Sequence, residues 1–461
     1  MKKITLLLAA GSLLSACNSK FSPGPDIKLE PSFKFHQQKH ELRSDIAPDT
    51  KWWTKFGDAT LNALIDEALA SSLSVEVARE RIRSARFSAR IIKGTYFPTL
   101  TASADTSMGE RTTTLDKRPL TWQRTDPNDP TKGAFKLGRT TSTADTSSAA
   151  AGLSGLWTLD LGAKPSAAQQ QALVEAEKET LNQTRLDIIA GMASAYINVQ
   201  GVGREVTIAQ KSLSVQNNTA AITKAKLEAG SVSALDSTRA TAQAALTAAD
   251  IPTLQQAREQ AINQIAILLG KEPAAVSNIF TKYRPVRYPR VRFSEGIPAD
   301  LLRNRPDVRV AEWQLKAAMS AIGVAEADQY PSLTLSGNVG VSSTIGRRTG
   351  TWNFGPSINI PIFQGGRVKA NINLTKSEAR IAYLQYRQTI LLAVQDVDDA
   401  LIAVKMEQIR HSKLQVAVAD LTKAEALARQ LNESGTTEFK DVLDAQAALY
   451  SAELELAGSS L

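Results

Sequence analysis

Two carboxylates near the C-terminal end of the sequence are spaced so that together they could attract cations. Asp441 and Asp444 follow Gly435 and are one helical turn apart, so on a helix they share a face. In a threefold assembly, two carboxylates from each of three copies would form two rings around the axis and attract cations. The alternative is that acids in a first helical turn only complement the helix macrodipole, which is worth roughly a few tenths of a kcal/mol.

The single cysteine of the chain is the second candidate for chemistry. Residues 1–16 contain two lysines, an apolar run and a small-residue site, which together indicate a secretory signal peptide that ends before Cys17. One cysteine excludes an intramolecular disulfide. The stretch LSAC over 14–17 resembles the lipobox of bacterial lipoproteins, and this resemblance implies an acylated Cys17. Asn18 then favours export to the outer membrane, with the anchor on its periplasmic side. The alternative is an ordinary buried thiol.

The remaining candidates for chemistry do not predict an enzyme. His36 and His40 are four residues apart but have no third ligand nearby, so a solvated arm over residues 17–57 is favoured over a metal site. His411 lies in a helical pattern without triad partners, and the sequence has neither a nucleophile elbow nor a P-loop. We therefore expect no catalytic residue, cofactor or metal.

The net charge of +8 does not predict a nucleic-acid partner. Acidic residues alternate with the basic residues of the polar region between 109 and 147, so no face of a single sign forms there.

Alternation of apolar and polar residues predicts four strands in two hairpins. The second hairpin comprises residues 332–341 and 352–363, with Leu335, Trp352, Phe354 and Ile358 on its apolar side. The first comprises residues 99–108 and 151–161, separated by about forty polar residues that we expect to be an outer loop. Strands of about ten residues with two unlike faces are typical of a transmembrane β-barrel, whose apolar side faces lipid.

Each hairpin is followed by a very long helical pattern that turns back at a glycine. The helical hairpins cover residues 165–269, with the tip at Gly230, and residues 366–457, with the tip at Gly435. The two tips match at an offset of 205, so the chain is a tandem duplication of residues 58–296 and 297–461. The same offset makes Asp236 and Arg239 the equivalents of Asp441 and Asp444. Arg239 is therefore a candidate charge partner between neighbouring hairpins.

These elements predict an α+β membrane protein that assembles from several copies. Four strands cannot close a membrane barrel, and three copies would supply twelve strands above a tunnel of long helices. We therefore expect a homotrimer.

Several motifs carry a family resemblance. IPADLLRNRPDVR over 297–309 and IGVAEADQYPSL over 322–333 resemble the signature of TolC-type outer-membrane efflux proteins. The motifs DIP at 250–252, LLG at 268–270, WW at 52–53 and DVLDAQ at 441–446 resemble the lipoprotein, NodT-like branch. The resemblance implies a trimeric channel with a twelve-stranded barrel and a helical periplasmic tunnel. It also implies an entrance, narrowed by aspartates matching Asp441 and Asp444, that opens when a periplasmic adaptor and an inner-membrane pump of the RND type dock.

The function implied is the outer-membrane step of small-molecule efflux. The sequence leaves two alternatives open. One is an exit duct for type I protein secretion, and the other is a periplasmic coiled-coil scaffold, which would explain the long helices but not the strands.

Overall fold

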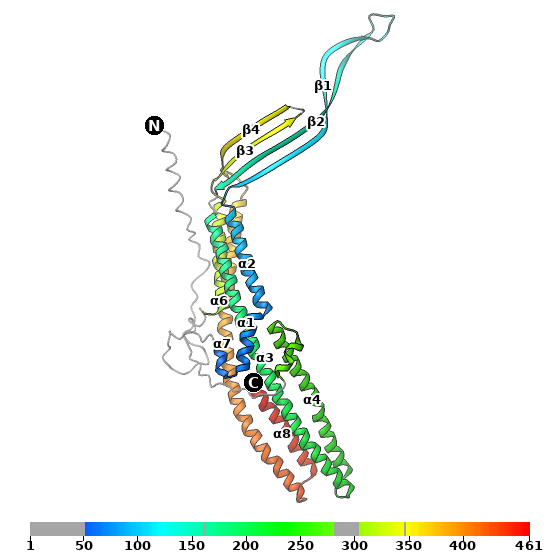
Figure 1. Ribbon diagram of the computed structural model, residues 1–461, viewed down its shortest axis with the longest axis vertical. Coiled ribbons are helices and arrows are strands. Elements are labelled where there is room, and N and C mark those ends of the chain that lie inside the picture. Colours follow the sequence, from blue (N-terminus) through cyan, green and yellow to red (C-terminus); the bar gives the residue numbers. More distant parts are fainter. Residues whose placement is uncertain (1–50, 160–162, 281–303, 345–346) are drawn as a thin grey trace, which may run out of the picture. The chain divides into compact units, whose positions relative to one another are not determined.

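The computed structural model describes residues 51–159, 163–280, 304–344 and 347–461 (Figure 1). Its contacts divide the chain into two compact units, one containing residues 87–170 and 318–377 and the other residues 51–86, 171–317 and 378–461. The elements, in chain order, are η2 (Trp52–Phe56), α1 (Ala59–Ser71), α2 (Leu73–Gly94), β1 (Thr99–Arg124), β2 (Gly133–Leu159), α3 (Ala163–Glu228), α4 (Ala234–Leu269), η3 (Pro273–Ala275), η4 (Ser277–Phe280), α6 (Pro306–Ala327), β3 (Ser332–Thr344), β4 (Arg347–Asn359), α7 (Arg367–Glu433) and α8 (Phe439–Ser459).

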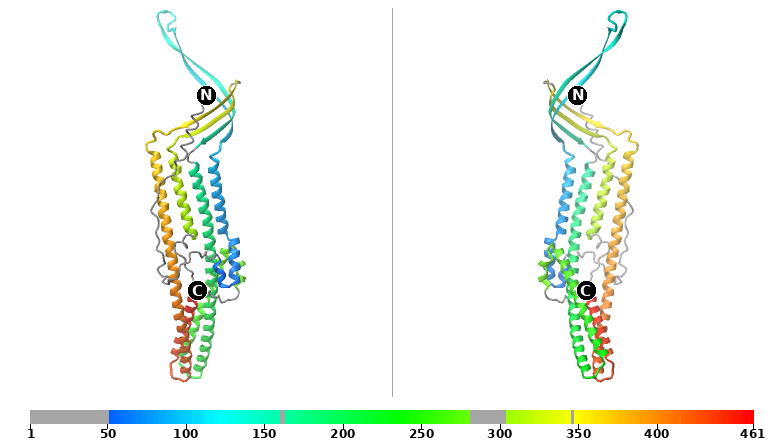
Figure 2. Two further views of the ribbon diagram at one scale, coloured as in Figure 1. Left: turned by 90° about the vertical axis from the view of Figure 1, so that its left-hand side faces the viewer. Right: turned by 90° about the vertical axis from the view of Figure 1, so that its right-hand side faces the viewer.

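The four strands of the first unit form one antiparallel sheet in the order β1-β2-β3-β4. Figure 2 shows them side by side in a curved sheet. Leu153 of β2 pairs with Val339 of β3, which in turn pairs with Trp352 of β4. Since directly paired residues of antiparallel strands point to the same side, the register decides which residues share a face.

One face of this sheet collects nearly all of its large apolar side chains. Trp352 and Phe354 are 82% and 73% exposed in the single chain, so no part of the described chain covers them. Leu156 is a large apolar residue on the opposite face, which otherwise carries mostly Ser, Thr and Asn. The apolar face comprises Leu100, Ala102, Ala104, Met108, Leu153, Trp157, Leu159, Leu333, Leu335, Val339, Val341, Trp352, Phe354 and Ile358.

The first hairpin is much longer than the sequence predicted. β1 and β2 have 26 and 27 residues instead of the expected strands 99–108 and 151–161, so the prediction of a forty-residue loop was wrong. The segment lacks apolar alternation but is rich in threonine, whose β-branched side chain favours extended backbone. Only residues 148–159 of β2 also pair with β3, so the distal part of the hairpin is a two-stranded ribbon.

The second strand hairpin begins at Ser332, as predicted, but β3 ends later than predicted, and β4 both begins and ends earlier. Most of the segment expected to link its strands is itself strand, and β4 covers Arg347–Asn359 instead of residues 352–363. Ser332, the first residue of β3, pairs with Asn359, so residues beyond Asn359 have no partner on β3. Pro361 also lacks the N–H that a ladder requires.

The second unit contains most of the length of the two long helical hairpins expected from the sequence. α3 has 66 residues and α7 has 67, and each turns back into a shorter helix, α4 or α8. Their tips lie at the same end of this unit (Figure 2). Among the helices in the described part of the chain, none is long and apolar enough to cross a membrane.

The main hydrophobic core of the second unit lies where α1 packs against α3 and α4. Leu61, Met192 and Ile265 are fully buried there. The Asp58 carboxylate caps α1 by accepting from the N–H of Thr60 at 2.8 Å, and it also accepts from the Tyr196 hydroxyl at 2.6 Å. One side chain therefore both starts α1 and joins it to α3.

The two faces of the sheet lead to a paired test. If the apolar face contacts lipid, Leu335→Arg should cost about 2–4 kcal/mol per chain and lower the yield of assembled protein. Ser336→Arg, on the opposite face of the same strand, is the matched control and should be tolerated. Yields are measured by gel filtration after detergent extraction. Equal effects of the two variants would mean that the apolar face does not contact lipid.

Candidate functional site

The two hairpin tips use the same turn. Gly230 and Gly435 have φ of 72° and 74°, a left-handed conformation that glycine adopts without a steric penalty. At each tip an N–H reaches back to a carbonyl five residues earlier at 2.8 Å, from Ser231 to Lys226 and from Thr436 to Leu431. This is the Schellman pattern of a helix end, repeated at an offset of 205.

Asp441 and Asp444 are exposed and lie in the first turns of α8, just past the tip. Lys440 Nζ lies 3.0 Å from Asp444 Oδ2. This hydrogen bond and the charge of Asp444 raise the pKa of Lys440, with a smaller contribution from Asp441, while the charge of Arg239 acts against the increase. The pair has the (i, i+4) spacing at which opposite charges meet on a helix, so the sequence carries a signal for it.

The equivalent position in the first repeat has a different role. Ser233 caps α4 by accepting from the N–H of Asp236 at 3.1 Å, and its hydroxyl donates to Asp236 Oδ2 at 2.7 Å. The Asp236 carboxylate is therefore part of a helix cap, which corresponds to the helix-end alternative. Arg239 is exposed one turn later. Within the described chain Asp444 pairs with Lys440, and Arg239 makes no ion pair with Asp441 or Asp444, so the expected pairing of Arg239 with an aspartate stays a prediction.

Farther from the tips, α8 contacts the first helical hairpin, formed by α3 and α4, through its buried polar side chains. Gln446 Nε2 donates to Thr219 Oγ1 of α3 at 3.2 Å, and the Tyr450 hydroxyl donates to Asp250 Oδ2 of α4 at 3.1 Å. Burial and the bond to Asp250 raise the pKa of Tyr450 to about 12. Sequence reasoning missed the Tyr450–Asp250 pair, although Asp250 stands in one of the quoted motifs, because nothing in the sequence gives the register between α4 and α8.

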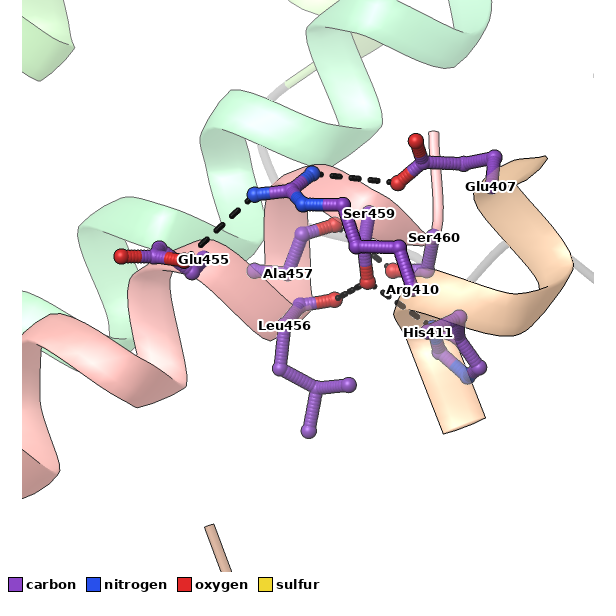
Figure 3. A network of polar contacts seen from close by, with 8 residues as sticks. All are labelled: Glu407, Arg410, His411, Glu455, Leu456, Ala457, Ser459 and Ser460. Atoms are coloured by element: carbon purple, nitrogen blue, oxygen red, sulfur yellow. Dashed lines mark hydrogen bonds and ion pairs between the residues drawn. The ribbon is translucent and has the colours of Figure 1, made fainter. Parts of the chain in front are cut away.

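A second polar network joins the C-terminal end of α8 to α7 (Figure 3). Arg410 lies 3.1 Å from Glu407 on its own helix and 3.5 Å from Glu455 on α8. His411 Nδ1 is 2.9 Å from Ser459 Oγ, whose hydroxyl donates to the Leu456 carbonyl. His411 is thus a half-buried, hydrogen-bonded residue of a helix.

A third network fixes the start of α6, in the motif RPDVR. Arg305 holds both oxygens of Asp307, at 3.2 and 2.9 Å, and reaches Asp396 of α7 at 2.8 Å. Burial would raise the pKa of Asp307, but the hydrogen bonds and the charge of Arg305 outweigh it and hold this pKa below its usual range. Arg309 contacts Glu179 of α3 at 3.4 Å, so the motif joins three helices.

The other predicted residues fall elsewhere or outside the described chain. Leu335, Trp352, Phe354 and Ile358 lie together on the apolar face of the sheet in the first unit. Cys17, His36 and His40 lie outside the described residues.

Two strand hairpins form one curved antiparallel sheet with an apolar face, and each is followed in the chain by a long helical hairpin. This arrangement defines the class of outer-membrane channels with a helical tunnel. The family model described as "Outer membrane efflux protein" matches residues 64–271 and 297–460, and the chain belongs to this family. Channels of this family are trimeric in their structures and work with adaptors and inner-membrane pumps. The chain is thus an outer-membrane channel protein of an efflux system.

Similar proteins cover almost the whole chain. Nodulation protein T of Rhizobium leguminosarum bv. trifolii is 31% identical over 455 residues, covering 96% of this chain and 91% of the relative. The pyoverdine export outer membrane protein OpmQ of Pseudomonas aeruginosa is 28% identical, covering 98% and 92%. Among solved structures, the outer-membrane channel OprN is 28% identical with a TM-score of 0.76 and covers 95% of each chain.

The Arg305–Asp307 pair makes stability depend on pH in a defined direction. Because the pKa of Asp307 is lowered by folding, its stabilisation is present above the unfolded-state pKa of about 3.9 and is lost as the pH falls through the folded-state pKa. Asp307→Asn should therefore lower the thermal unfolding midpoint near pH 7 and reduce its decrease between pH 5 and pH 3. Asp420→Asn, an exposed acid of α7 paired with Lys423, is the control. An unchanged acid dependence in Asp307→Asn would contradict the assignment.

Proposed function

We propose that three copies of this chain form a channel with a twelve-stranded barrel. The observation that carries the proposal is the four-stranded sheet, whose outer strands β1 and β4 each pair on one side only within the described chain. An unpaired backbone edge in lipid costs several kcal/mol per group, so a neighbouring copy must complete it. Four strands from each of three copies give twelve.

We further propose that the channel passes small molecules from an adaptor and an RND-type pump to the cell exterior, and that it is a conduit without catalytic activity. The name of one similar protein, OpmQ, refers to pyoverdine export. That name supports efflux of small compounds over export of protein through a type I system. The pump would select the substrate, because a wide aqueous duct discriminates little.

The entrance is proposed to lie at the helical tips, with Asp441 and Asp444 as its charged constriction. Two observations support this role. Both carboxylates are exposed at the tip end of α8, and neither takes part in a helix cap of the kind that Asp236 makes.

Replacing both aspartates by alanine tests the constriction. In planar bilayers the double variant should raise single-channel conductance, because the shorter alanine side chains widen the constriction. It should also reduce cation preference, because the rings of negative charge are gone. Assembly yield should not change. Asp420→Ala, which removes an exposed acid of α7 with its own lysine partner, should leave both quantities as in the parent. Parent-like conductance and selectivity in the double variant would mean that these aspartates only complement the helix macrodipole.

We also propose that Cys17 is the acylated N-terminus of the mature chain and anchors it to the periplasmic side of the outer membrane. The lipobox-like stretch and the absence of any other cysteine in the sequence support this modification. Acyl chains contribute about 0.8 kcal/mol per buried CH₂, and more than one chain is needed for a stable anchor.

Intact-mass spectrometry checks the anchor. The mature protein should begin at Cys17 and carry added acyl mass, while Cys17→Ser should lose this mass and still assemble, because strand pairing does not depend on the anchor. A mature protein with an unmodified Cys17, or one that still begins at Met1, would refute the modification.

A further inference from the structure

The helices that adjoin the sheet differ in charge near the strands. α2 ends at Gly94 and leads into β1, and α7 begins at Arg367 and follows β4. Residues 81–104 and 329–377, which include these two helix ends, contain no aspartate or glutamate. By contrast, Asp328 follows α6, and Asp160 precedes α3 in the sequence. Positive charge without a neighbouring acid therefore collects at the helices of the two outer strands.

Each of these two helix ends carries two exposed cations. They are Arg90 and Lys93 in the last turns of α2, and Arg367 and Lys369 in the first turn of α7. Within the described residues, none of the four forms an ion pair with a carboxylate. The Arg90 guanidinium carbon lies 5.7 Å from the centre of the Phe87 ring, and Arg367 donates to the neutral side chain of Gln364. All four charges are therefore open to an anionic ligand.

Exposed apolar side chains lie in the chain between these cations and the strands. Phe97, between α2 and β1, is 69% exposed, and Ile362 and Phe363, between β4 and α7, are 93% and 89% exposed. Membrane barrels carry aromatic girdles at the boundary between hydrocarbon and headgroups, and long basic side chains reach from that boundary to the headgroups. The four cations are therefore suited to the headgroup level of the periplasmic leaflet.

The two pairs of cations belong to opposite edges of one sheet but would meet between copies. β1 and β4 are the outer strands, so in the proposed trimer β4 of one copy pairs with β1 of the next. The start of α7 then adjoins the end of α2 of the neighbouring copy. We propose that each such junction binds an anionic phospholipid of the periplasmic leaflet, whose phosphate contacts all four cations. The proposal rests on the proposed trimer, because a single chain holds each site only in halves.

The chemistry of these groups suits a lipid phosphate. A guanidinium presents paired N–H donors that match two phosphate oxygens, and an ammonium adds a compact charge. Ile362 and Phe363 supply apolar surface for the first part of an acyl chain. Phosphatidylglycerol has a net negative charge, whereas phosphatidylethanolamine is zwitterionic. A site with four cations and no adjacent acid therefore prefers phosphatidylglycerol.

Native mass spectrometry of detergent-extracted trimers with added phosphatidylglycerol tests the site. The parent should bind three of these lipids, one at each junction, and should bind phosphatidylethanolamine roughly tenfold more weakly. Arg90→Gln with Lys93→Gln removes one half of each site, and Arg367→Gln with Lys369→Gln removes the other. Each double variant should lower the affinity roughly twenty-five-fold, about fivefold for each charge lost. Both should remain trimers on gel filtration, because all four side chains are exposed.

Arg347→Gln with Arg348→Gln is the matched control. These exposed arginines begin β4 at the opposite end of the sheet and lie in the same acid-free stretch, so their loss should leave lipid binding unchanged. The site is refuted if either test variant binds like the parent or keeps half of the lipid. Equal loss in the control, or equal binding of the two lipids, would also refute it. Parent trimers without bound phosphatidylglycerol would refute the site alone, whereas a monomeric parent would refute the proposed assembly.

Discussion

Cross-strand register is the constraint on which the rest of the structure depends. Side chains alternate along a strand, so a slip of one residue between β3 and β4 would turn Trp352 and Phe354 to the polar face. The observed register instead unites the apolar residues of all four strands on one side. A sheet of this kind needs lipid on that side and partners at both edges, so membrane insertion and assembly are linked consequences of one pairing pattern.

The long helices form the periplasmic part of the channel. Their cores are not uniformly apolar, and near the tips polar side chains such as Gln216 and Gln446 are buried instead. Hydrogen bonds between polar groups contribute little net stability but fix the relative positions of helices. A bundle built in this way can exchange some of these bonds for water, whereas an apolar core would pay the full hydrophobic cost of exposure.

Sequence reasoning predicted the elements whose periodicity is strong. Alternation identified the apolar strand residues, and the offset of 205 matched the turns at Gly230 and Gly435, where the structure repeats the same hydrogen bonds. It failed where periodicity carries no signal. The sequence of the threonine-rich extension of β1 and β2 lacks apolar alternation and therefore resembles that of a loop. The Tyr450–Asp250 pair depends on how two helices slide along each other, which no pattern within either helix determines.

The distal ribbon of β1 and β2 differs from the rest of the sheet in how its amide protons exchange with solvent and in how fast its sequence can diverge. Residues 133–147 of β2 pair with β1 alone, over roughly 50 Å at about 3.3 Å per residue. Two-stranded ribbons are marginally stable in water, so amide protons here exchange by local opening at a free energy well below that of the four-stranded part. Substitutions, insertions or proteolytic nicks in the ribbon therefore leave the register of the remaining sheet intact, and this segment is free to diverge faster than the strands it extends.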